Sequence, residues 1–433
     1  MPGNKIRGFI GVKSNDGHDA AILVVADIMK KGGIEVILGG YDLTVDKFVR
    51  AVVQEGVHFA GISSYNGGHM PFFRAVRDEL RRRDYPFLHI VGGGGATITP
   101  PEIEALEREE GIDKIFRSGE GHLVAPFIRE HYDFPAVNGH PEDLLEGVLD
   151  GNELAISQAL NVAEEKARLE SALEKIKAGL DWPEDSRAAR EALDRPLEKD
   201  GPAAKEVLAQ VRRYSDFLSK LDAPAGESGT TVYGIAGRGG AGKSALIDEL
   251  VLRFFKDARA GRKKCAILAV DPSSHSSGGA LLADRIAYMY ATDKNWVDVG
   301  RTYVRSVASR GHGQGIARAL PDMVKILKAA GYEIFVETYG TGQPDSGIVG
   351  LVDKPVFVAT PDIGGAAQIA KEEMLNLPGA TVALNKSELP GARHVSSLLR
   401  GRVAEERLFL TTAIEHDNAG VNRLYRFLTE HYS

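Results

Sequence analysis

The feature of this sequence that most constrains its fold is the run Gly237-Arg238-Gly239-Gly240-Ala241-Gly242-Lys243-Ser244, which has the spacing G-x-x-x-x-G-K-S. An apolar run at 231–236 fits a buried strand, and apolar residues at helical spacing follow over 245–255. In this context the backbone N–H groups of the loop surround phosphates, the lysine reaches the β- and γ-phosphates, and the serine hydroxyl can hold Mg²⁺. A glycine-rich turn could match by chance, but the flanking strand and helix favour nucleotide binding.

Length and charge narrow the remaining possibilities. A chain of 433 residues is long enough for two or three domains. Its net charge of −7 argues against a sequence-independent nucleic-acid binder, and no run approaches the ~18 apolar residues of a membrane helix. Cys265 is the single cysteine, so no internal disulfide is possible and the thiol is expected to pack in a strand. No apolar signal region begins the chain, so we expect a cytoplasmic protein without nucleic-acid or membrane partners.

The first 135 residues alternate between strand and helix patterns with short connections. This alternation predicts an α/β domain with a doubly wound parallel sheet, in which ligands bind at the carboxyl ends of the strands. The predicted strands are 7–12, 35–39, 59–64 and 88–92, and the predicted helices are 20–31, 45–54 and 71–83.

Three loops fall at those strand ends and carry candidate ligand-binding residues. The first holds Asp16 and His18, a pairing that suits a metal ligand whose second ring nitrogen is oriented by a carboxylate. The second follows Ser63 and Ser64 and reaches His69, and the third contains Gly92, Gly93 and Gly94, which leave space for a bulky ligand beside the backbone. Each loop alone could be an ordinary turn.

Together the three loops resemble the cobalamin-binding domain of the coenzyme B12-dependent acyl-CoA mutases. That family carries D-x-H-x-x-G, and here Ala21 stands where the glycine would be. The resemblance implies a flavodoxin-like (Rossmann-type) fold in which His18 is the lower cobalt ligand and Asp16 tunes it. It also implies that the nucleotide tail of the cofactor runs past the serines and the glycine loop, with His69 near the corrin edge. A flavodoxin-like or response-regulator-like domain without cobalamin is the alternative.

The middle of the chain, 136–229, is helical and charged. Helices are predicted from 152 to about 177 and from 202 to 221, where Pro202 suits a first helical position. We interpret the segment as a helical linker that packs on both neighbouring domains. A docking surface for a partner subunit is the alternative.

The last domain, 230–433, carries further residues suited to a nucleotide hydrolase. Asp271 and Glu337 end apolar strands where they can approach Mg²⁺ with Ser244, and Gln343 follows on a glycine-containing segment that could position water. Lys243, Glu337 and Gln343 are therefore the candidate catalytic residues. Asn385, Lys386 and Glu388 form N-K-x-E, close to the N-K-x-D that reads guanine in GTPases, although an ordinary polar turn is the alternative.

These motifs resemble the MeaB/ArgK class of G-proteins, which are chaperones of B12-dependent mutases. Two residues depart from the pattern of this class: Tyr339, a bulky ring inside the Glu-Thr motif, and Glu388, which has the charge of the usual aspartate on a longer side chain.

The order of the two domains resembles the fused isobutyryl-CoA mutase family. No stretch matches the family's acyl-CoA-binding barrel, so we expect a separate large mutase subunit as partner, with an adenosyltransferase as cofactor donor and self-association. The implied cofactors are adenosylcobalamin, GTP/GDP and Mg²⁺, with GTP hydrolysis gating cofactor loading. A cobalamin-responsive regulatory module, or a metal-insertion GTPase using His18 and His69, are the competing hypotheses.

Overall fold

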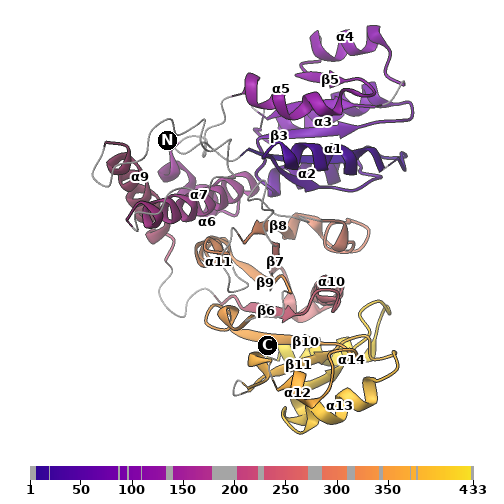
Figure 1. Ribbon diagram of the computed structural model, residues 1–433, viewed down its shortest axis with the longest axis vertical. Coiled ribbons are helices and arrows are strands. Elements are labelled where there is room, and N and C mark those ends of the chain that lie inside the picture. The colour runs from indigo at the N-terminus through magenta and orange to yellow at the C-terminus, as the bar shows by residue number, and fades with distance from the viewer. Residues whose placement is uncertain are drawn as a thin grey trace. The chain divides into compact units, whose positions relative to one another are not determined.

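A computed structural model of the chain divides into two compact units (Figure 1). It describes residues 6–18, 20–85, 88–94, 97–108, 110–132, 140–177, 202–222, 229–271, 285–309, 317–340, 345–370, 372–376 and 379–430. Unit 1 comprises Met1–Ala225, Ser273–Arg285 and Arg318–Ala330, and unit 2 comprises Gly226–Pro272, Ile286–Ala317 and Gly331–Ser433. Unit 1 is therefore assembled from three stretches of the chain.

Unit 1 is built on a parallel sheet of five strands in the order β2-β1-β3-β4-β5. The strands are β1 (Arg7–Val12), β2 (Glu35–Leu38), β3 (Phe59–Ser63), β4 (His89–Gly93) and β5 (Lys114–Phe116). The helices around it are α1 (Ala20–Lys31), α2 (Val45–Gln54), α3 (His69–Arg82), α4 (Pro100–Arg108) and α5 (Val124–His131). This order is the flavodoxin-like one, with β1 and β3 at the point where the strand order reverses.

The apolar runs of the first segment fold as the sequence predicts, because strands covered on both faces need continuous apolar residues. Phe9, Val36 and Phe59 are fully buried. Two differences stand out. The sequence assigned no element after β4, whereas the structure adds α4, β5 and α5, and His69, expected on a loop, is the first residue of α3.

The helical segment that follows belongs to unit 1. It contains α6 (Leu145–Leu149), α7 (Glu153–Lys177) and α9 (Pro202–Ser219), and α7 and α9 lie side by side in Figure 1. Helix α11 (Leu320–Ala329), far along the chain, packs against both α7 and α9. The Lys166 ammonium of α7 lies 3.0 Å from the Asp322 carboxylate of α11, which fixes this contact. No described helix is long and apolar enough to cross a membrane.

Unit 2 is built on a parallel sheet of seven strands in the order β12-β11-β10-β6-β9-β7-β8. The strands are β6 (Val232–Gly237), β7 (Lys264–Asp271), β8 (Thr302–Ala308), β9 (Tyr332–Glu337), β10 (Lys354–Ala359), β11 (Thr381–Leu384) and β12 (Leu408–Leu410). Its helices are α10 (Lys243–Lys256), α12 (Ala366–Ile369), α13 (Ala392–Arg400) and α14 (Ala419–Leu428). Cys265 is buried in β7, and burial raises the pKa of its thiol.

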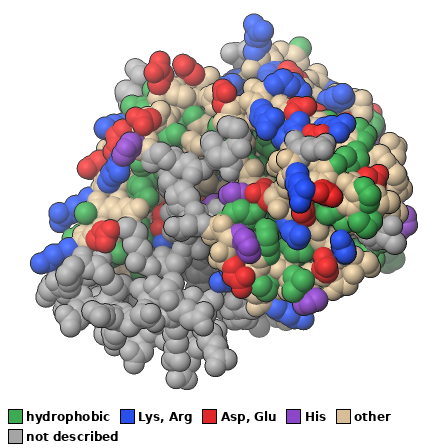
Figure 2. All heavy atoms as spheres, turned by 90° about the horizontal axis from the view of Figure 1, so that it is seen from above, with side chains coloured by type: hydrophobic (Ala, Val, Ile, Leu, Met, Phe, Trp, Pro, Cys, Tyr) green, Lys and Arg blue, Asp and Glu red, His purple; other side chains and the backbone are tan. Residues whose placement is uncertain are grey.

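Charged side chains of both signs are interspersed with hydrophobic ones on the face shown in Figure 2. Ion pairs also form within α3 and between α3 and the segment after α4: the Arg77 guanidinium of α3 pairs with the Asp78 carboxylate at 2.8 Å and with the Glu110 carboxylate at 2.5 Å.

Candidate functional site

The loop between β1 and α1 presents one imidazole whose orientation is fixed by a buried carboxylate. Asp16 Oδ1 lies 2.7 Å from His18 Nδ1 and accepts the His18 backbone N–H at 3.2 Å. The backbone N–H groups of Tyr65 and Asn66 donate to Asp16 Oδ2, the second at 3.0 Å. The Asp16 side chain is 0 % exposed and the His18 side chain 66 % exposed.

These hydrogen bonds decide the charge of Asp16. Burial alone would raise the pKa of its carboxyl, but the bonds from the Tyr65 N–H, the His18 ring and the Asn66 N–H hold it below its usual value. A lowered pKa in the folded state means that the bonds stabilise the loop at neutral pH and are lost as the pH falls through that pKa. Asp16 is therefore an ionised acceptor, and the His18 Nδ1 must carry the proton.

With the proton on Nδ1, the lone pair of His18 lies on Nε2 of an exposed ring. This is the arrangement that metal-ligating histidines use, with an outer carboxylate that fixes the tautomer and raises the basicity of the ligand. The His18 ring also stacks on Tyr65, with 5.3 Å between ring centroids and 23° between planes. The sequence did not single out Tyr65, although it lies in the loop that contains the predicted serines.

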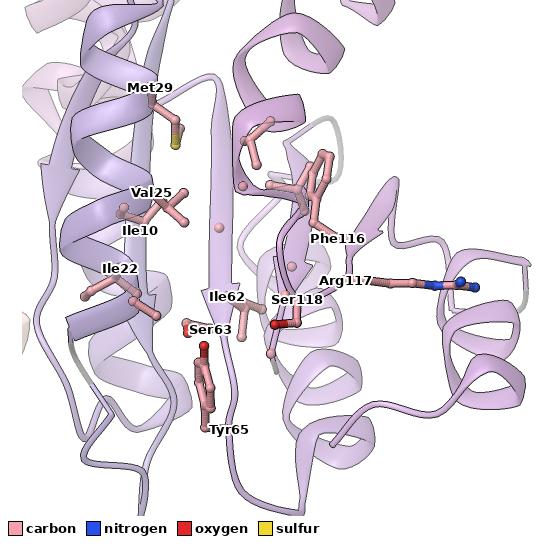
Figure 3. Close-up of a pocket in the computed structure, with 18 of the residues that line it drawn as sticks. Ile10, Ile22, Val25, Met29, Ile62, Ser63, Tyr65, Phe116, Arg117 and Ser118 are labelled. Atoms are coloured by element: carbon pink, nitrogen blue, oxygen red, sulfur yellow. The ribbon is translucent and has the colours of Figure 1, made fainter. Parts of the chain in front are cut away.

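An apolar cavity lies between α1 and the ends of the central strands (Figure 3). It encloses about 740 Å³, part of it open to solvent. Most of its lining is apolar, and the rest consists of small or polar residues. The apolar lining includes Ile10, Ile22, Val25, Met29 and Phe116, and the small or polar lining includes Ser63, Tyr65, Gly92, Gly93 and Gly94.

The structure therefore brings the predicted serine and glycine loops together at one cavity, with Tyr65 joining the cavity to His18. Ser64 has a different place: it is fully buried, and its hydroxyl donates to the Asn66 carbonyl at 3.0 Å, which shapes the loop that holds Asp16. Gly94 must lack a side chain because a Cβ there would overlap the Ser64 carbonyl oxygen.

His69 lies apart from the lining of this cavity. Its side chain is 6 % exposed, and its Nε2 is 3.2 Å from Glu102 Oε1 at the start of α4. The residues that sequence reasoning missed are the apolar walls. Their signal was present in α1, where Ile22, Val25 and Met29 recur at helical spacing on one face.

The second site lies at the carboxyl end of β6, where the glycine-rich loop turns into α10. Gly242 caps α10 with φ of 82°, a conformation that favours glycine. The Lys243 ammonium donates to the Arg238 carbonyl at 3.1 Å, across the loop that it closes. Backbone N–H groups at the first turn of a helix suit phosphate oxygens, as the motif predicted.

Two hydroxyls hold the carboxylate that ends β9. Ser244 Oγ donates to Glu337 Oε1 at 2.9 Å, and the Tyr288 hydroxyl donates to Glu337 Oε2 at 2.6 Å. Burial raises the pKa of the Glu337 carboxyl, against the opposing effects of Lys243 and the two hydroxyls. Asp271 ends β7, which pairs directly with β9, so the two predicted acids lie at the same edge of the sheet. Gln343 lies outside the described residues.

The N-K-x-E segment follows β11, and its asparagine ties three loops together. Asn385 is buried, donates from Nδ2 to the Ala241 carbonyl at 2.9 Å, and accepts at Oδ1 from the Ala413 N–H at 3.0 Å. Glu388 is exposed, and its Oε2 accepts the Thr412 hydroxyl at 2.8 Å. The loop after β12, which contains Thr412 and Ala413, was not identified from the sequence.

Comparisons with known proteins match the two ends of the chain to two different families. Residues 6–126 match the B12 binding domain family, and residues 204–416 match the methylmalonyl Co-A mutase-associated GTPase MeaB family. The fused isobutyryl-CoA mutase of Geobacillus kaustophilus is 32 % identical over 96 % of this chain and 35 % of its own length. Those of Cupriavidus metallidurans and Nocardia farcinica are 33 % and 34 % identical over 99 % of this chain and 36 % of their own lengths.

The two parts of the chain belong to the B12 binding domain family and the MeaB GTPase family. The chain joins a B12-binding domain to a MeaB GTPase domain, as the sequence motifs predicted, and spans about a third of the length of the curated relatives it matches. The two candidate sites described above fall one in each domain.

The Asp16 carboxylate yields the first testable prediction. The substitution Asp16→Asn keeps the shape of the side chain but removes the charge that holds Nδ1–H, so it should lower the affinity for cobalamin by about 10- to 100-fold. The measurement is a titration with hydroxocobalamin followed by absorbance. Asp27→Asn is the matched control, because Asp27 is an exposed acid of α1 that pairs with Lys31. Equal affinities of the two variants would contradict the role given to Asp16.

Glu388 and Thr412 yield a prediction for the MeaB domain. The Thr412 hydroxyl donates to one oxygen of Glu388, and the other oxygen is the predicted acceptor for the N–H groups of guanine. Thr412→Val should therefore weaken GDP binding by about 2- to 10-fold, the worth of one hydrogen bond, and should leave the affinity for ADP unchanged. Fluorescence titrations with both nucleotides measure this, and Thr429→Val is a control in α14's C-cap. A parallel loss for both nucleotides would show that Thr412 supports the fold and not base selection.

Proposed function

We propose that this chain binds adenosylcobalamin through His18, hydrolyses GTP in its MeaB domain, and uses the nucleotide state to gate loading and release of the cofactor. The observation that supports cobalamin binding best is the exposed Nε2 of an imidazole whose Nδ1–H is held by Asp16, beside an apolar cavity. A single imidazole supplies one ligand, so a metal bound there needs its other ligands from elsewhere, as a corrin macrocycle provides.

The cavity also fits the rest of the cofactor. Its apolar side chains suit an aromatic base such as benzimidazole. The glycines and the serine in its lining let a sugar-phosphate chain approach the backbone. In this proposal His18 would hold the cobalt in place of the base, and the cavity would hold the displaced base. Bound adenosylcobalamin supplies radical chemistry through cleavage of its cobalt–carbon bond, while the protein positions it.

In the MeaB domain, Lys243 and the N–H groups of the glycine-rich loop would hold the GTP phosphates. Ser244, Asp271 and Glu337 would hold Mg²⁺, which neutralises charge on the phosphates. Ser244 can hold the metal while its hydroxyl proton stays hydrogen-bonded to Glu337, because the serine oxygen keeps lone pairs for the metal. Gln343 stays a predicted water-positioning residue.

The mutase reaction belongs to an assembly in this proposal. The B12-binding domain would present its cofactor to an acyl-CoA-binding mutase subunit on a separate chain. Adenosyltransferase as cofactor donor and self-association of the chain are further parts of the proposal.

The His18 assignment predicts a spectroscopic signature. Cob(II)alamin bound to the wild-type chain should show triplet hyperfine splitting from one axial ¹⁴N in electron paramagnetic resonance, and doublet splitting when the protein is uniformly ¹⁵N-labelled. The change of pattern distinguishes a protein imidazole from the cofactor's own base. His18→Ala should lose this response, whereas His131→Ala, which alters an exposed histidine stacked on Phe127, should keep it. A triplet that persists after labelling would exclude His18 as the ligand.

The gating proposal predicts that the bound nucleotide changes the rate at which the chain releases cobalamin. GTP hydrolysis, measured by phosphate release, should be abolished in Lys243→Ala, and the rate of cobalamin release should differ between GTP-loaded and GDP-loaded wild-type chains. Lys256→Ala, on the last turn of the same helix, is the control for hydrolysis. Identical release rates in the two nucleotide states would reject gating while leaving both binding activities intact.

A further inference from the structure

The short turn η4 (Arg285–Ala287) carries contacts that neither candidate site explains. Arg285 ends the second stretch of unit 1, and its side chain is 6 % exposed. Its guanidinium lies 3.1 Å from Glu55 Oε1 and donates to Gln54 Oε1 at 2.8 Å. These two residues are the C-cap and the last residue of α2, where the helix dipole favours a positive charge.

Glu55 links Arg285 to a buried cluster of charges at the same end of the sheet. The Arg7 guanidinium lies 2.7 Å from Glu55 Oε2, 3.2 Å from Glu164 on α7 and 3.8 Å from Glu35 on β2. Each side chain in this group is at most 8 % exposed, so water compensates little of the charge. Among these five groups, three carboxylates face two guanidiniums, and removal of Arg285 would leave three carboxylates facing one guanidinium.

The C-terminal end of helix α2 lies at this cluster, and the segment before its N-terminal end contacts the β1–α1 loop that contains Asp16 and His18. The ten residues of α2 span about 15 Å, the length of a rigid helical rod. At the N-terminal end, the Leu43 N–H donates to the Val12 carbonyl at 3.0 Å, and the Asn15 N–H donates to Asp42 Oδ1 at 2.8 Å. Asn15 directly precedes Asp16, so the segment that leads into α2 supports the loop that orients His18.

The residue that directly follows η4 contacts the candidate nucleotide site. Tyr288 lies three residues after Arg285, is 2 % exposed, and donates its hydroxyl to Glu337 Oε2 at 2.6 Å. The boundary between the two units falls between Arg285 and Ile286. One turn of chain thus connects a buried ion pair of unit 1 to a buried carboxylate contact of unit 2.

We propose that η4 couples the two ligand sites, with Tyr288 as a positioning residue for Glu337 and Arg285 as the anchor that binds Glu55 of unit 1. This inference rests on the proposed function. A change at Glu337 that shifts Tyr288 must be taken up within three residues of Arg285, because the turn rises only about 2 Å per residue. Through Glu55 and α2, such a shift biases the position of the loop that holds His18.

Thermodynamic linkage makes this measurable, because cobalamin must change nucleotide affinity by the same factor as nucleotide changes cobalamin affinity. The experiment measures the Kd of the full chain for a non-hydrolysable GTP analogue, with and without saturating adenosylcobalamin. The ratio of the two values should be at least about fivefold in the wild-type chain, the lower end for allosteric coupling. In Arg285→Met the ratio should fall to one while each ligand still binds.

Glu164→Gln is the matched control. It removes a carboxylate of the same cluster that accepts from Arg7, whereas Arg285 bonds Glu55 and Gln54. The control should keep the wild-type ratio, whereas a general loosening of the cluster would lower it in both variants and overturn the proposal. An unchanged ratio in Arg285→Met would also overturn it. A wild-type chain that fails to bind one of the ligands contradicts the proposed function itself.

Tyr288→Phe tests the other end and keeps the buried ring in place. It should lower the kcat for GTP hydrolysis about tenfold with KM within twofold, because Glu337 loses a fixed donor and the phosphate contacts remain, and it should also bring the coupling ratio towards one. This variant decides the matter if Arg285→Met does not fold. Wild-type kcat together with a wild-type ratio would show that Tyr288 only fills space.

Discussion

The hydrogen bonds to Asp16 are the constraint on which the first candidate site depends. One carboxylate accepts N–H groups from two loops and from the ring of His18, so the β1–α1 loop and the loop after β3 are fixed by the same two oxygen atoms. Ser64 and Gly94 support this arrangement. The Ser64 hydroxyl bonds the Asn66 carbonyl within the loop after β3, and the missing Cβ of Gly94 lets the loop after β4 approach the Ser64 carbonyl oxygen. This buried polar network fixes the orientation of the His18 ring and so leaves its Nε2 exposed.

The nucleotide site follows the same principle with an amide at its centre. Asn385 contacts the glycine-rich loop through its N–H₂ group and the loop after β12 through its oxygen. These loops follow parallel strands of one sheet and therefore lie at the same edge, so that the Asn385 side chain can contact both. Glu337 completes the site from β9 with two hydroxyl donors, one of which comes from a segment that the motif does not include.

Much of the fold could be predicted because buried parallel strands and amphipathic helices leave strong patterns. The strands and helices up to β4 lie within two residues of the expected bounds, as do α7 and the start of α9. The pattern weakens where elements are short: β5 has three residues, and α5 has eight. The polar motif residues could be identified because their chemistry is specific, whereas Tyr65, Thr412 and Tyr288 act through contacts between distant segments that no local spacing reveals.

The membership of α11 in unit 1 has a consequence for how the chain is made. Residues 318–330 pack with α7 and α9 although the strands on either side belong to unit 2. During synthesis from the N-terminus, the buried face of the helical segment stays uncovered until the ribosome has added about a hundred residues beyond the end of α9. The helical segment therefore completes its packing only after a large part of the GTPase domain has been synthesised, and a nascent chain released early exposes apolar helix surface to aggregation.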